Sequence, residues 1–290
     1  MITTAKHDMI SQLKSLWKLC FHDEDAYIDF YYENRFKAEE TLVYLIEDQV
    51  VAMLTLMPGY VVHHKAKLPV RYVYAVATHP EHRRKGYAAA LMEHANQMIK
   101  KDYVGTFLVP ANPSLFGYYE TLGYQTLSHK RVLHISMENF FKDLKQFDSK
   151  HEIEKVEPLT VEDFYSLRNK AFTKAGFVLW EQEDLSYLLK EFIFLGGQAQ
   201  KVILRKEGDL HYEEGALLYY QDNDTLIIKE TTLSDVSLYA AVKYLSSQIA
   251  VSHMSVILPK HSKILGEEAP YVMAFAKGFE GEEYVNLVLD

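Results

Sequence analysis

A basic run that ends in a glycine lies within residues 79–94, which read HPEHRRKGYAAALMEH. Arg83, Arg84 and Lys85 precede Gly86, and the alanine-rich segment that follows has the apolar spacing of a helix. Amides in the first turn of a helix lack partners and lie at the positive end of the helix dipole, so they attract phosphate. A glycine lets the backbone approach a bulky anion because it has no side chain. We therefore expect a pyrophosphate-binding corner here.

The basic run has a simpler interpretation as the solvated start of a helix, which is what most charge runs are. Basic residues in a first helical turn, however, oppose the dipole and lower stability when nothing is bound. Such a conflict is typical of a functional site and favours the anion site. The sequence contains neither Gly-x-x-x-x-Gly-Lys-Ser/Thr nor Gly-x-Gly-x-x-Gly. Nucleotide hydrolases and dinucleotide-binding proteins need those motifs, so these classes are not favoured.

The composition is that of an ordinary globular protein, with 290 residues, 48% hydrophobic and 24% charged. The formal net charge of −9 opposes non-specific binding to nucleic acid or anionic membranes. Cys20 is the only cysteine, which excludes an internal disulfide and indicates a reducing compartment, and its apolar neighbours predict a core position. The first 20 residues read as an amphipathic helix rather than a secretory signal, and no apolar run reaches the roughly 18 residues of a spanning helix. We expect a cytoplasmic protein.

Hydrophobic periodicity predicts helices and strands in a mixed order around one sheet, an α/β class. In the first half, helices are expected at residues 8–20, 24–36, 85–99 and 115–124, and strands in the segments TLVYLIEDQ, VVAMLTLMPGYVV, LPVRYVYAVAT, YVGTFLVP and KRVLHIS. After a polar segment at 143–158, which we interpret as a linker, nearly the same order begins again. It ends in the expected strands YVMAFAK and EYVNLVLD. We predict one domain at residues 1–142 and a second at 155–290.

The two halves have the features of a diverged duplication. GYAAAL at 86–91 is similar to LYAAVK at 238–243. In that alignment the basic corner is replaced by Asp235, Val236, Ser237 and Leu238. We therefore expect that the second half does not bind the same anion.

The segment YVYAVATHPEHRRKGYAAALM resembles the acetyl-coenzyme A signature of the GNAT N-acetyltransferase superfamily, Arg/Gln-x-x-Gly-x-Gly/Ala, through Arg83, Gly86 and Ala88. The segment ANPSLFGYYETLGYQ is similar to the second signature of that superfamily, through Asn112, Tyr119, Gly123 and Tyr124. The opening WKLCFHDEDAYIDFYYENRF and the degenerate second half resemble the Eis-like branch, whose members carry two GNAT domains in tandem. This resemblance implies two tandem GNAT-like domains, each a mixed, mostly antiparallel sheet flanked by helices. Members of the branch usually continue into a third, sterol-carrier-like domain, for which 290 residues leave no room.

The resemblance also implies acetyl-coenzyme A as the acyl donor. The strand LPVRYVYAVAT would separate from its neighbour at its end, so that its backbone binds the pantetheine arm, and the next corner would hold the pyrophosphate. Asn112 would orient the cofactor or the following helix. The implied cofactor-binding residues are Val76, Ala77, Thr78, Arg83, Arg84, Lys85, Gly86, Tyr87, Ala88, Ala89 and Asn112.

The chemistry requires an amine that attacks the thioester carbonyl, a group that accepts a proton from the amine, and an acid that protonates the leaving thiolate. The resemblance nominates Tyr119 as the acid, although its place in an aromatic run is also explained by packing. The resemblance nominates the carboxylate of Asp290 as the base, because the C-terminal carboxylate fills a central role in Eis-like enzymes. The acidic cluster at 22–25 is either a helix cap or part of the acceptor site. His63, His64, His79 and His82 lack the partners of a metal site, so no metal is expected.

These observations predict an N-acetyltransferase that moves an acetyl group directly to a primary amine in a ternary complex, because no activated Cys or Ser is evident. The excess of acidic residues favours a cationic small molecule or peptide as the acceptor. One alternative is a non-catalytic acyl-coenzyme A sensor or structural protein. Another is a tandem-GNAT aminoacyl transferase that reads charged RNA, which the net charge of −9 disfavours. We expect no nucleic acid or membrane partner, and a homo-oligomer is compatible with the sequence.

Overall fold

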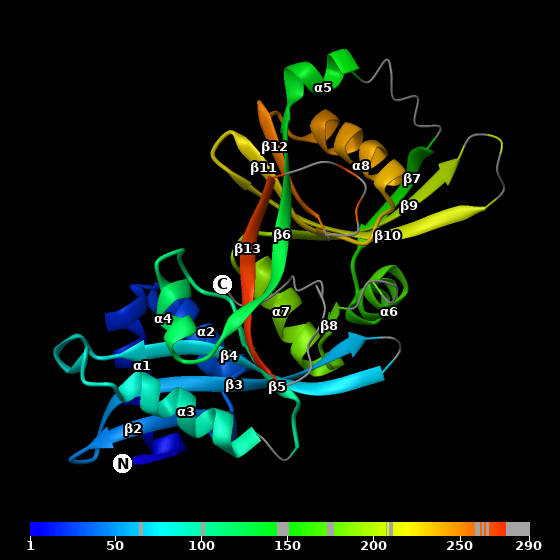
Figure 1. Ribbon diagram of the computed structural model, residues 1–290. Helices are drawn as coiled ribbons and strands as arrows, with labels where there is room; N and C mark the ends of the chain where they lie inside the picture. Colours follow the sequence, from blue (N-terminus) through cyan, green and yellow to red (C-terminus); the bar gives the residue numbers. More distant parts are fainter. Residues whose placement is uncertain are drawn as a thin grey trace.

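The computed structural model describes residues 1–63, 66–99, 102–143, 151–172, 177–206, 208, 211–258, 262, 264 and 267–276. Within these residues, the strands of both halves form one 13-stranded sheet (Figure 1). The strands are β1 (Ile2–Thr4), β2 (Thr41–Ile46), β3 (Gln49–His63), β4 (Ala66–Thr78), β5 (Gly105–Leu108), β6 (Gln125–Ser136), β7 (His151–Pro158), β8 (Phe177–Leu179), β9 (Gln198–Lys206), β10 (Tyr212–Asp222), β11 (Thr225–Thr231), β12 (His253–Leu258) and β13 (Glu267–Ala276). The helices are α1 (Ile10–Phe21), α2 (Asp25–Asn34), α3 (Tyr87–Ile99), α4 (Leu115–Thr121), α5 (Met137–Asp143), α6 (Val161–Phe172), α7 (Gln182–Phe194) and α8 (Asp235–Gln248), with short 3-10 turns at His7–Met9, Ala38–Glu40 and Pro80–His82.

The first half is built from an antiparallel meander and a parallel crossover. Strands β2, β3 and β4 pair antiparallel in sequence order, and β4 then pairs parallel with β5 after α3. Glu47 and Asp48 form the turn between β2 and β3, with positive φ values of 48° and 62°. The periodicity of the sequence thus predicts the local elements of this half.

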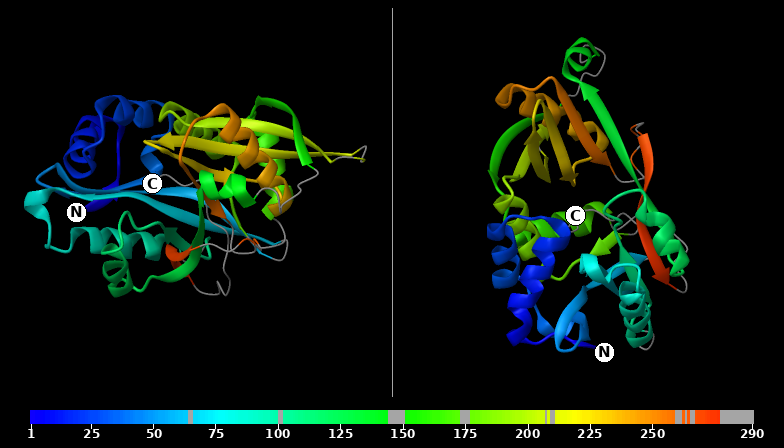
Figure 2. Two further views of the ribbon diagram at one scale, coloured as in Figure 1. Left: turned by 90° about the horizontal axis from the view of Figure 1, so that it is seen from above. Right: turned by 90° about the vertical axis from the view of Figure 1, so that its left-hand side faces the viewer.

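Helices cover the first-half sheet on both faces (Figure 2). On one face, α1 and α2 bury Leu13, Leu16 and Trp17 among strand residues and residues of α7. On the other face, α3 and α4 enclose a second cluster that includes Leu91 and Tyr119. The two faces of β4 and β5 are therefore lined by different sets of helices.

The second half repeats this arrangement. Strands β9, β10 and β11 pair antiparallel, and β12 pairs parallel with β11 after α8, as β5 does with β4 after α3. The apolar face of α8 packs into its own core with Leu226 and Ile228 of β11. The predicted fold class, a mixed and mostly antiparallel sheet flanked by helices, is confirmed.

Each half completes its sheet with a strand from the other half. β6 of the first half pairs with β12, and β13 of the second half lies between β5 and β6. In Figure 1 these two strands run side by side between the lower and upper parts of the molecule. The division into residues 1–142 and 155–290 stays a prediction, and any such division crosses this strand exchange.

The polar segment 143–158, which we expected to be a linker, contains the last residue of α5 and all of β7. β7 pairs antiparallel with β9 and is the last strand of the sheet order. An edge strand tolerates charged side chains because one of its sides faces solvent, which explains why this strand lacks a clear apolar alternation. Residues 144–150 of the expected linker and the expected strand EYVNLVLD lie outside the described residues.

Buried ion pairs reinforce the packing. The Arg35 guanidinium at the end of α2 lies 2.8 Å from Glu40 and 2.9 Å from Asp184 of α7. Arg168 of α6 and Glu230 of β11 pair at 2.6 Å with 1% and 0% of their side chains exposed. In the described part of the chain, no helix is long and apolar enough to cross a membrane.

Candidate functional site

The sheet opens where β4 and β5 separate. They pair at three positions, from Val70 with Gly105 to Tyr72 with Phe107. Beyond Tyr72, β4 continues to Thr78 with β3 on one side, whereas β5 ends at Leu108 and pairs along its other edge with β13. The separation that the resemblance implied is therefore present, with the backbone of residues 76–78 along its edge.

A β-bulge shapes this part of β4. Ala75 adopts a φ of 52°, and the register with β3 shifts so that residues 75 and 76 together face Leu54. Val76 packs with the cluster under α3, whereas Ala77 is buried with the cluster under α1 and α2. Bulges re-aim side chains and often lie next to functional sites.

The basic corner follows the strand directly. Arg84 and Gly86 adopt φ values of 61° and 83°, and α3 starts at Tyr87. The Ala90 amide donates to the Gly86 carbonyl at 2.9 Å, so the amides from Gly86 to Ala89 precede the first amide that donates within the helix. A Cβ on Gly86 would meet no atom within 4 Å, so the glycine leaves open space at the helix start. Such a corner fits a pyrophosphate.

The side chains of Arg83, Arg84 and Lys85 are exposed around this corner. The Arg83 side chain is hydrogen-bonded to the end of β4, because its Nε donates to the Thr78 carbonyl at 3.2 Å. Cys20 Sγ donates to the same carbonyl at 3.3 Å. Cys20, which we expected in the core, is therefore only partly buried and lies beside the corner. Burial raises the pKa of its thiol, and Arg83 partly offsets that rise.

The equivalent corner of the second half is capped by its own side chains. Ser234 precedes α8, and its hydroxyl accepts from the Ser237 amide at 3.3 Å. Glu213 accepts from the Ser234 amide at 3.3 Å and from the Ser237 hydroxyl at 2.5 Å. A carboxylate thus lies where an anion would bind, which agrees with the prediction that this half does not bind the same anion.

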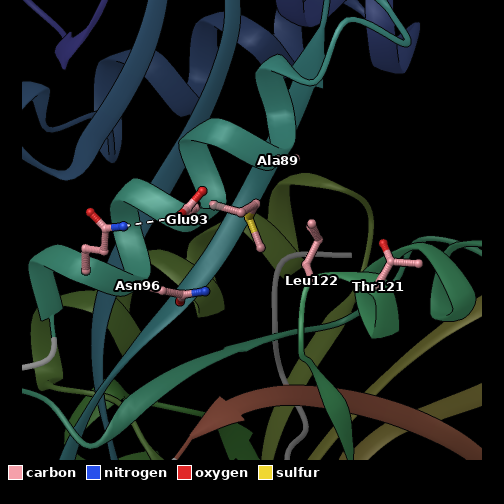
Figure 3. A pocket seen from close by; sticks show the side chains of 7 residues that line it. Ala89, Glu93, Asn96, Thr121 and Leu122 are labelled. Atoms are coloured by element: carbon pink, nitrogen blue, oxygen red, sulfur yellow. Dashed lines mark hydrogen bonds between the residues drawn. The ribbon is translucent and has the colours of Figure 1, made fainter.

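A pocket of about 340 Å³ lies one helical turn beyond the basic corner. Figure 3 shows it between α3 and the end of α4. It is lined by Ala89, Met92, Glu93, Asn96, Gln97, Thr121 and Leu122. Within the lining, the buried Asn96 accepts from the Thr106 hydroxyl at 2.9 Å, and Gln97 donates to Glu93 at 3.1 Å. Of the predicted cofactor-binding residues, Ala89 lines this pocket.

Tyr119 lies on α4 with 7% of its surface exposed. Its ring contacts those of Tyr118 and Tyr124, and burial raises the pKa of its phenol well above the usual value. The hydroxyl therefore stays protonated at neutral pH and retains a proton to donate. Asn112 holds the chain that leads into α4, since its Oδ1 accepts from the Ser114 amide at 3.1 Å. This contact fits the expectation that Asn112 orients the following helix.

Comparison with known families then decides the class of the first half. Residues 1–127 match the family model of the acetyltransferase (GNAT) domain. The chain carries a GNAT acetyltransferase domain. This domain contains the basic corner, the strand opening and Tyr119, and it makes the protein an acyltransferase. No curated protein matches the sequence.

Solved structures resemble this chain over both halves. A conserved protein of unknown function from Enterococcus faecalis, named as a probable N-acyltransferase, has a TM-score of 0.74 at 17% identity, covering 95% of this chain and 72% of that one. A GCN5-related N-acetyltransferase from Anabaena variabilis has a TM-score of 0.71 at 18% identity, covering 94% and 72%. Eis1 from Mycobacterium abscessus has a TM-score of 0.67 at 12% identity, covering 95% and 73%. The predicted resemblance is confirmed, and these folds support the tandem architecture.

The face of the GNAT sheet opposite α3 carries a cluster that the sequence did not reveal. Glu191 of α7 accepts from the Tyr27 hydroxyl at 2.6 Å and from the Tyr187 hydroxyl at 3.2 Å. The Tyr27 and Tyr74 hydroxyls lie 3.1 Å apart. The aromatic run of α2 was visible in the sequence, but its carboxylate partner is 164 positions away. Only the tertiary structure brings them together.

The acidic cluster at 22–25 lies next to these aromatic side chains. Asp23 accepts from the Trp17 indole at 2.7 Å, and Lys18 lies 2.5 Å from Asp25. His22 ends α1 with a φ of 63°. These contacts give the cluster a structural role at the turn between α1 and α2.

The predicted base and the histidines considered for a metal site are described only in part. Asp290 lies outside the described residues, as does His64, and the side chain of His63 is not described. His79 Nδ1 accepts from the Glu81 amide at 3.3 Å in a short turn. Among the residues that the structure describes, no group of three His, Cys, Asp or Glu side chains is arranged to hold a metal ion.

Proposed function

We propose that the protein is an N-acetyltransferase that moves an acetyl group from acetyl-coenzyme A to a primary amine. The observation that carries this proposal is the basic corner at the start of α3, where the amides of Gly86 to Ala89 precede the first amide that donates within the helix. The corner lies directly after a strand whose edge is open beyond Tyr72. A phosphate-bearing carrier with an extended, amide-containing arm matches both features.

In this proposal the donor would lie along the open edge of β4 and the start of α3. Backbone groups of Val76, Ala77 and Thr78 would bind the pantetheine arm as an added strand. The segment from Arg83 to Ala89 would hold the pyrophosphate, with Arg83, Arg84 and Lys85 supplying charge and Gly86, Tyr87, Ala88 and Ala89 supplying backbone amides. The pocket between α3 and α4 would accept the adenosine end, since the Glu93 carboxylate offers an acceptor to an exocyclic amine. Asn112 would act indirectly, because it holds the chain that leads into α4 and so orients that helix.

The reaction is a direct transfer in a ternary complex. The donor supplies a thioester whose carbonyl carbon accepts the amine. Tyr119 would protonate the leaving sulfur, since burial keeps its phenol protonated. Nucleophilic catalysis by Cys20 is not favoured, because burial raises the pKa of its thiol and lowers the fraction of thiolate.

The acceptor class follows from charge and from the chemistry of the domain. A net charge of −9 favours a cationic small molecule or peptide that bears a primary amine. The first half would bind the donor, and the second half would be a degenerate GNAT-like domain that shapes the acceptor site through α7. We place this reaction in the cytoplasm.

Two measurements test the proposal. Calorimetric titration with acetyl-coenzyme A measures binding, and a free-thiol assay over a panel of polyamines, amino sugars and lysyl peptides measures transfer. Binding together with thiol release on at least one amine supports the enzyme. Binding without release on any amine would favour a non-catalytic acyl-coenzyme A sensor, and absence of binding would contradict both functions.

A further inference from the structure

Glu191 is a buried carboxylate at the junction of the two halves. It is 6% exposed and lies on α7, yet its hydrogen-bond donors include Tyr27 of α2. Burial of a carboxylate costs free energy unless hydrogen bonds compensate for lost water. An apolar side chain would pack among the surrounding rings without that cost. A carboxylate in this position is therefore more easily explained by a role in proton transfer than by a role in packing.

The hydrogen bonds that reach Glu191 have a defined direction. A carboxylate only accepts, so the Tyr27 hydroxyl gives its proton to Glu191 at 2.6 Å. The 3.1 Å contact between Tyr27 and Tyr74 must then be donated by Tyr74. The oxygen of Tyr74 keeps a lone pair that can accept a proton from a further group. The three side chains form a chain of donors that ends at the buried carboxylate.

The outer end of this chain lies at the opening of the sheet. Tyr74 is two residues beyond Tyr72, the last residue of β4 that pairs with β5. Tyr74 packs with the cluster under α1 and α2, whereas Tyr119 packs with the cluster under α3 and α4. The chain and the predicted acid thus lie on opposite faces of the strands that would hold the thioester. Tyr27 and Tyr74 are partly exposed and Glu191 is buried, so the chain leads inward.

We propose that Glu191 is the terminal proton acceptor of the transfer and that Tyr74 and Tyr27 carry the proton to it. This inference rests on the proposed function. As the amine nitrogen bonds to the acetyl carbon and the carbon–sulfur bond breaks, the amine proton passes to Tyr74. The Tyr74 proton then passes to Tyr27, and the Tyr27 proton passes to Glu191. The sulfur takes its proton from Tyr119. Return of the Glu191 proton to solvent along the same chain, and uptake of one by Tyr119, restores the enzyme.

The surroundings of the chain keep its hydroxyls neutral. Burial raises the pKa of Tyr27, and the charge of Glu191 raises it further. Burial, Tyr27 and Glu191 raise the pKa of Tyr74 in the same way. Among the described residues, the ionisable groups that face these three include Tyr31, Tyr187 and, beside Tyr27, Asp23. Neutral hydroxyls can accept and donate a proton in the same step, which a relay requires.

Four variants of the full chain test the relay. Glu191→Gln, Tyr27→Phe and Tyr74→Phe each remove one proton-carrying group. Tyr31→Phe is the matched control, because its hydroxyl lies 3.5 Å from Thr55 in the same aromatic cluster and outside the relay. The readouts are kcat/KM from thiol release with acetyl-coenzyme A and the best amine of the panel, and the Kd of acetyl-coenzyme A by calorimetry.

The relay predicts that each of the three variants lowers kcat/KM about 100-fold, the usual contribution of a general base, with the Kd unchanged. Pairs of these substitutions should lower kcat/KM no further than single ones, because groups that act as a unit are not additive. The loss should be smaller with hydroxylamine, whose nitrogen gives up a proton more readily. The Tyr31→Phe control should stay within about threefold of the wild type.

The outcomes separate this inference from the function on which it rests. If Glu191→Gln acetylates the amine within about threefold of the wild type, the relay is overturned and the enzyme stands. Additive losses, or equal losses with hydroxylamine, would also overturn the relay in favour of a packing role. If the wild type acetylates no amine, the proposed function itself fails and the relay with it. If Glu191→Gln does not fold, Tyr74→Phe serves as the test, because it keeps the ring packing and removes only the hydroxyl. Activity of Tyr74→Phe within about threefold of the wild type would then overturn the relay.

Discussion

Tyr72 on β4 and Phe107 on β5 form the last pair before these strands separate, and their rings stack with centroids 5.1 Å apart. The stack marks the end of the pairing between β4 and β5, and β4 then continues to the basic corner with only β3 beside it. Two aromatic rings at this position fix where the paired region ends. The location of the proposed thioester site therefore follows from a packing contact as well as from the corner that binds charge.

Replacement of Gly86 tests the corner. Gly86→Val introduces a side chain where φ is 83° and where the space before the helix is open. We expect acetyl-coenzyme A binding to weaken by at least about tenfold, which corresponds to about 1.4 kcal/mol. Calorimetry measures the effect. Gly196→Val is the control, because Gly196 has a φ of 91° and equally open space but lies after α7. It should lose stability and keep its affinity; equal losses of affinity in both variants would argue against the corner.

Removal of the Tyr119 hydroxyl tests the acid. Tyr119→Phe should lower kcat about 100-fold while the Kd of acetyl-coenzyme A changes little. Because burial raises the pKa of Tyr119, its loss of a proton should not produce an alkaline limb of activity near the ordinary tyrosine value. Tyr124→Phe is the control, since its hydroxyl lies 2.7 Å from Thr106 within the core. Full turnover of Tyr119→Phe across the pH range would remove Tyr119 from the mechanism.

Loss of one partner of the ion pair between Arg168 and Glu230 should lower the free energy of unfolding more than replacement of both partners by apolar residues. Glu230→Gln leaves a buried guanidinium without its counter-charge, and we expect a loss of about 3–5 kcal/mol in the free energy of unfolding. The double variant Arg168→Met with Glu230→Leu should recover at least half of this loss, because no charge remains buried. Urea unfolding measures both. A double variant less stable than Glu230→Gln would show that the pair itself stabilises the fold.

Stability should fall at alkaline pH. Burial raises the pKa of Tyr31 and of Tyr124 to about 12, above the usual 10. Below pH 10 both phenols are protonated in the folded and unfolded chain. Between about pH 10 and 12 only the unfolded chain loses these protons, so unfolding becomes more favourable by on the order of 2 kcal/mol per tyrosine. Urea midpoints at several pH values should show this decline, and it should be smaller in Tyr124→Phe. An equal decline in that variant would argue that Tyr124 titrates normally.

Local features of this chain could be predicted from its sequence, because they depend on neighbouring residues. The helix that follows Gly86 and the strands on either side of Glu47 and Asp48 follow from spacing and local backbone preference. The GNAT signatures lie within single strand-turn-helix units, so they were also visible. The same reasoning predicted that the corner at α8 differs from the corner at α3.

Features that join distant segments could not be predicted in this way. The strand exchange between β6 and β13 depends on pairing partners that the strand patterns do not specify. The charged residues of β7 predict a linker rather than a strand, and only its pairing with β9 at the edge of the sheet explains why this charge is tolerated. Glu191 lies in an ordinary amphipathic helix, and only the fold shows that it accepts from Tyr27. The positive φ of Ala75 is likewise set by the register with β3 rather than by its own residue type.

A crystal structure with coenzyme A bound tests the central claim most directly. The account predicts that the pyrophosphate oxygens lie within hydrogen-bond distance of backbone amides between Arg84 and Ala89. The pantetheine amides should pair with Val76 to Thr78, and the sulfur should lie between the Tyr119 and Tyr74 faces of the strand opening. A cofactor bound elsewhere, or one whose pyrophosphate makes no contact with the start of α3, would contradict the account.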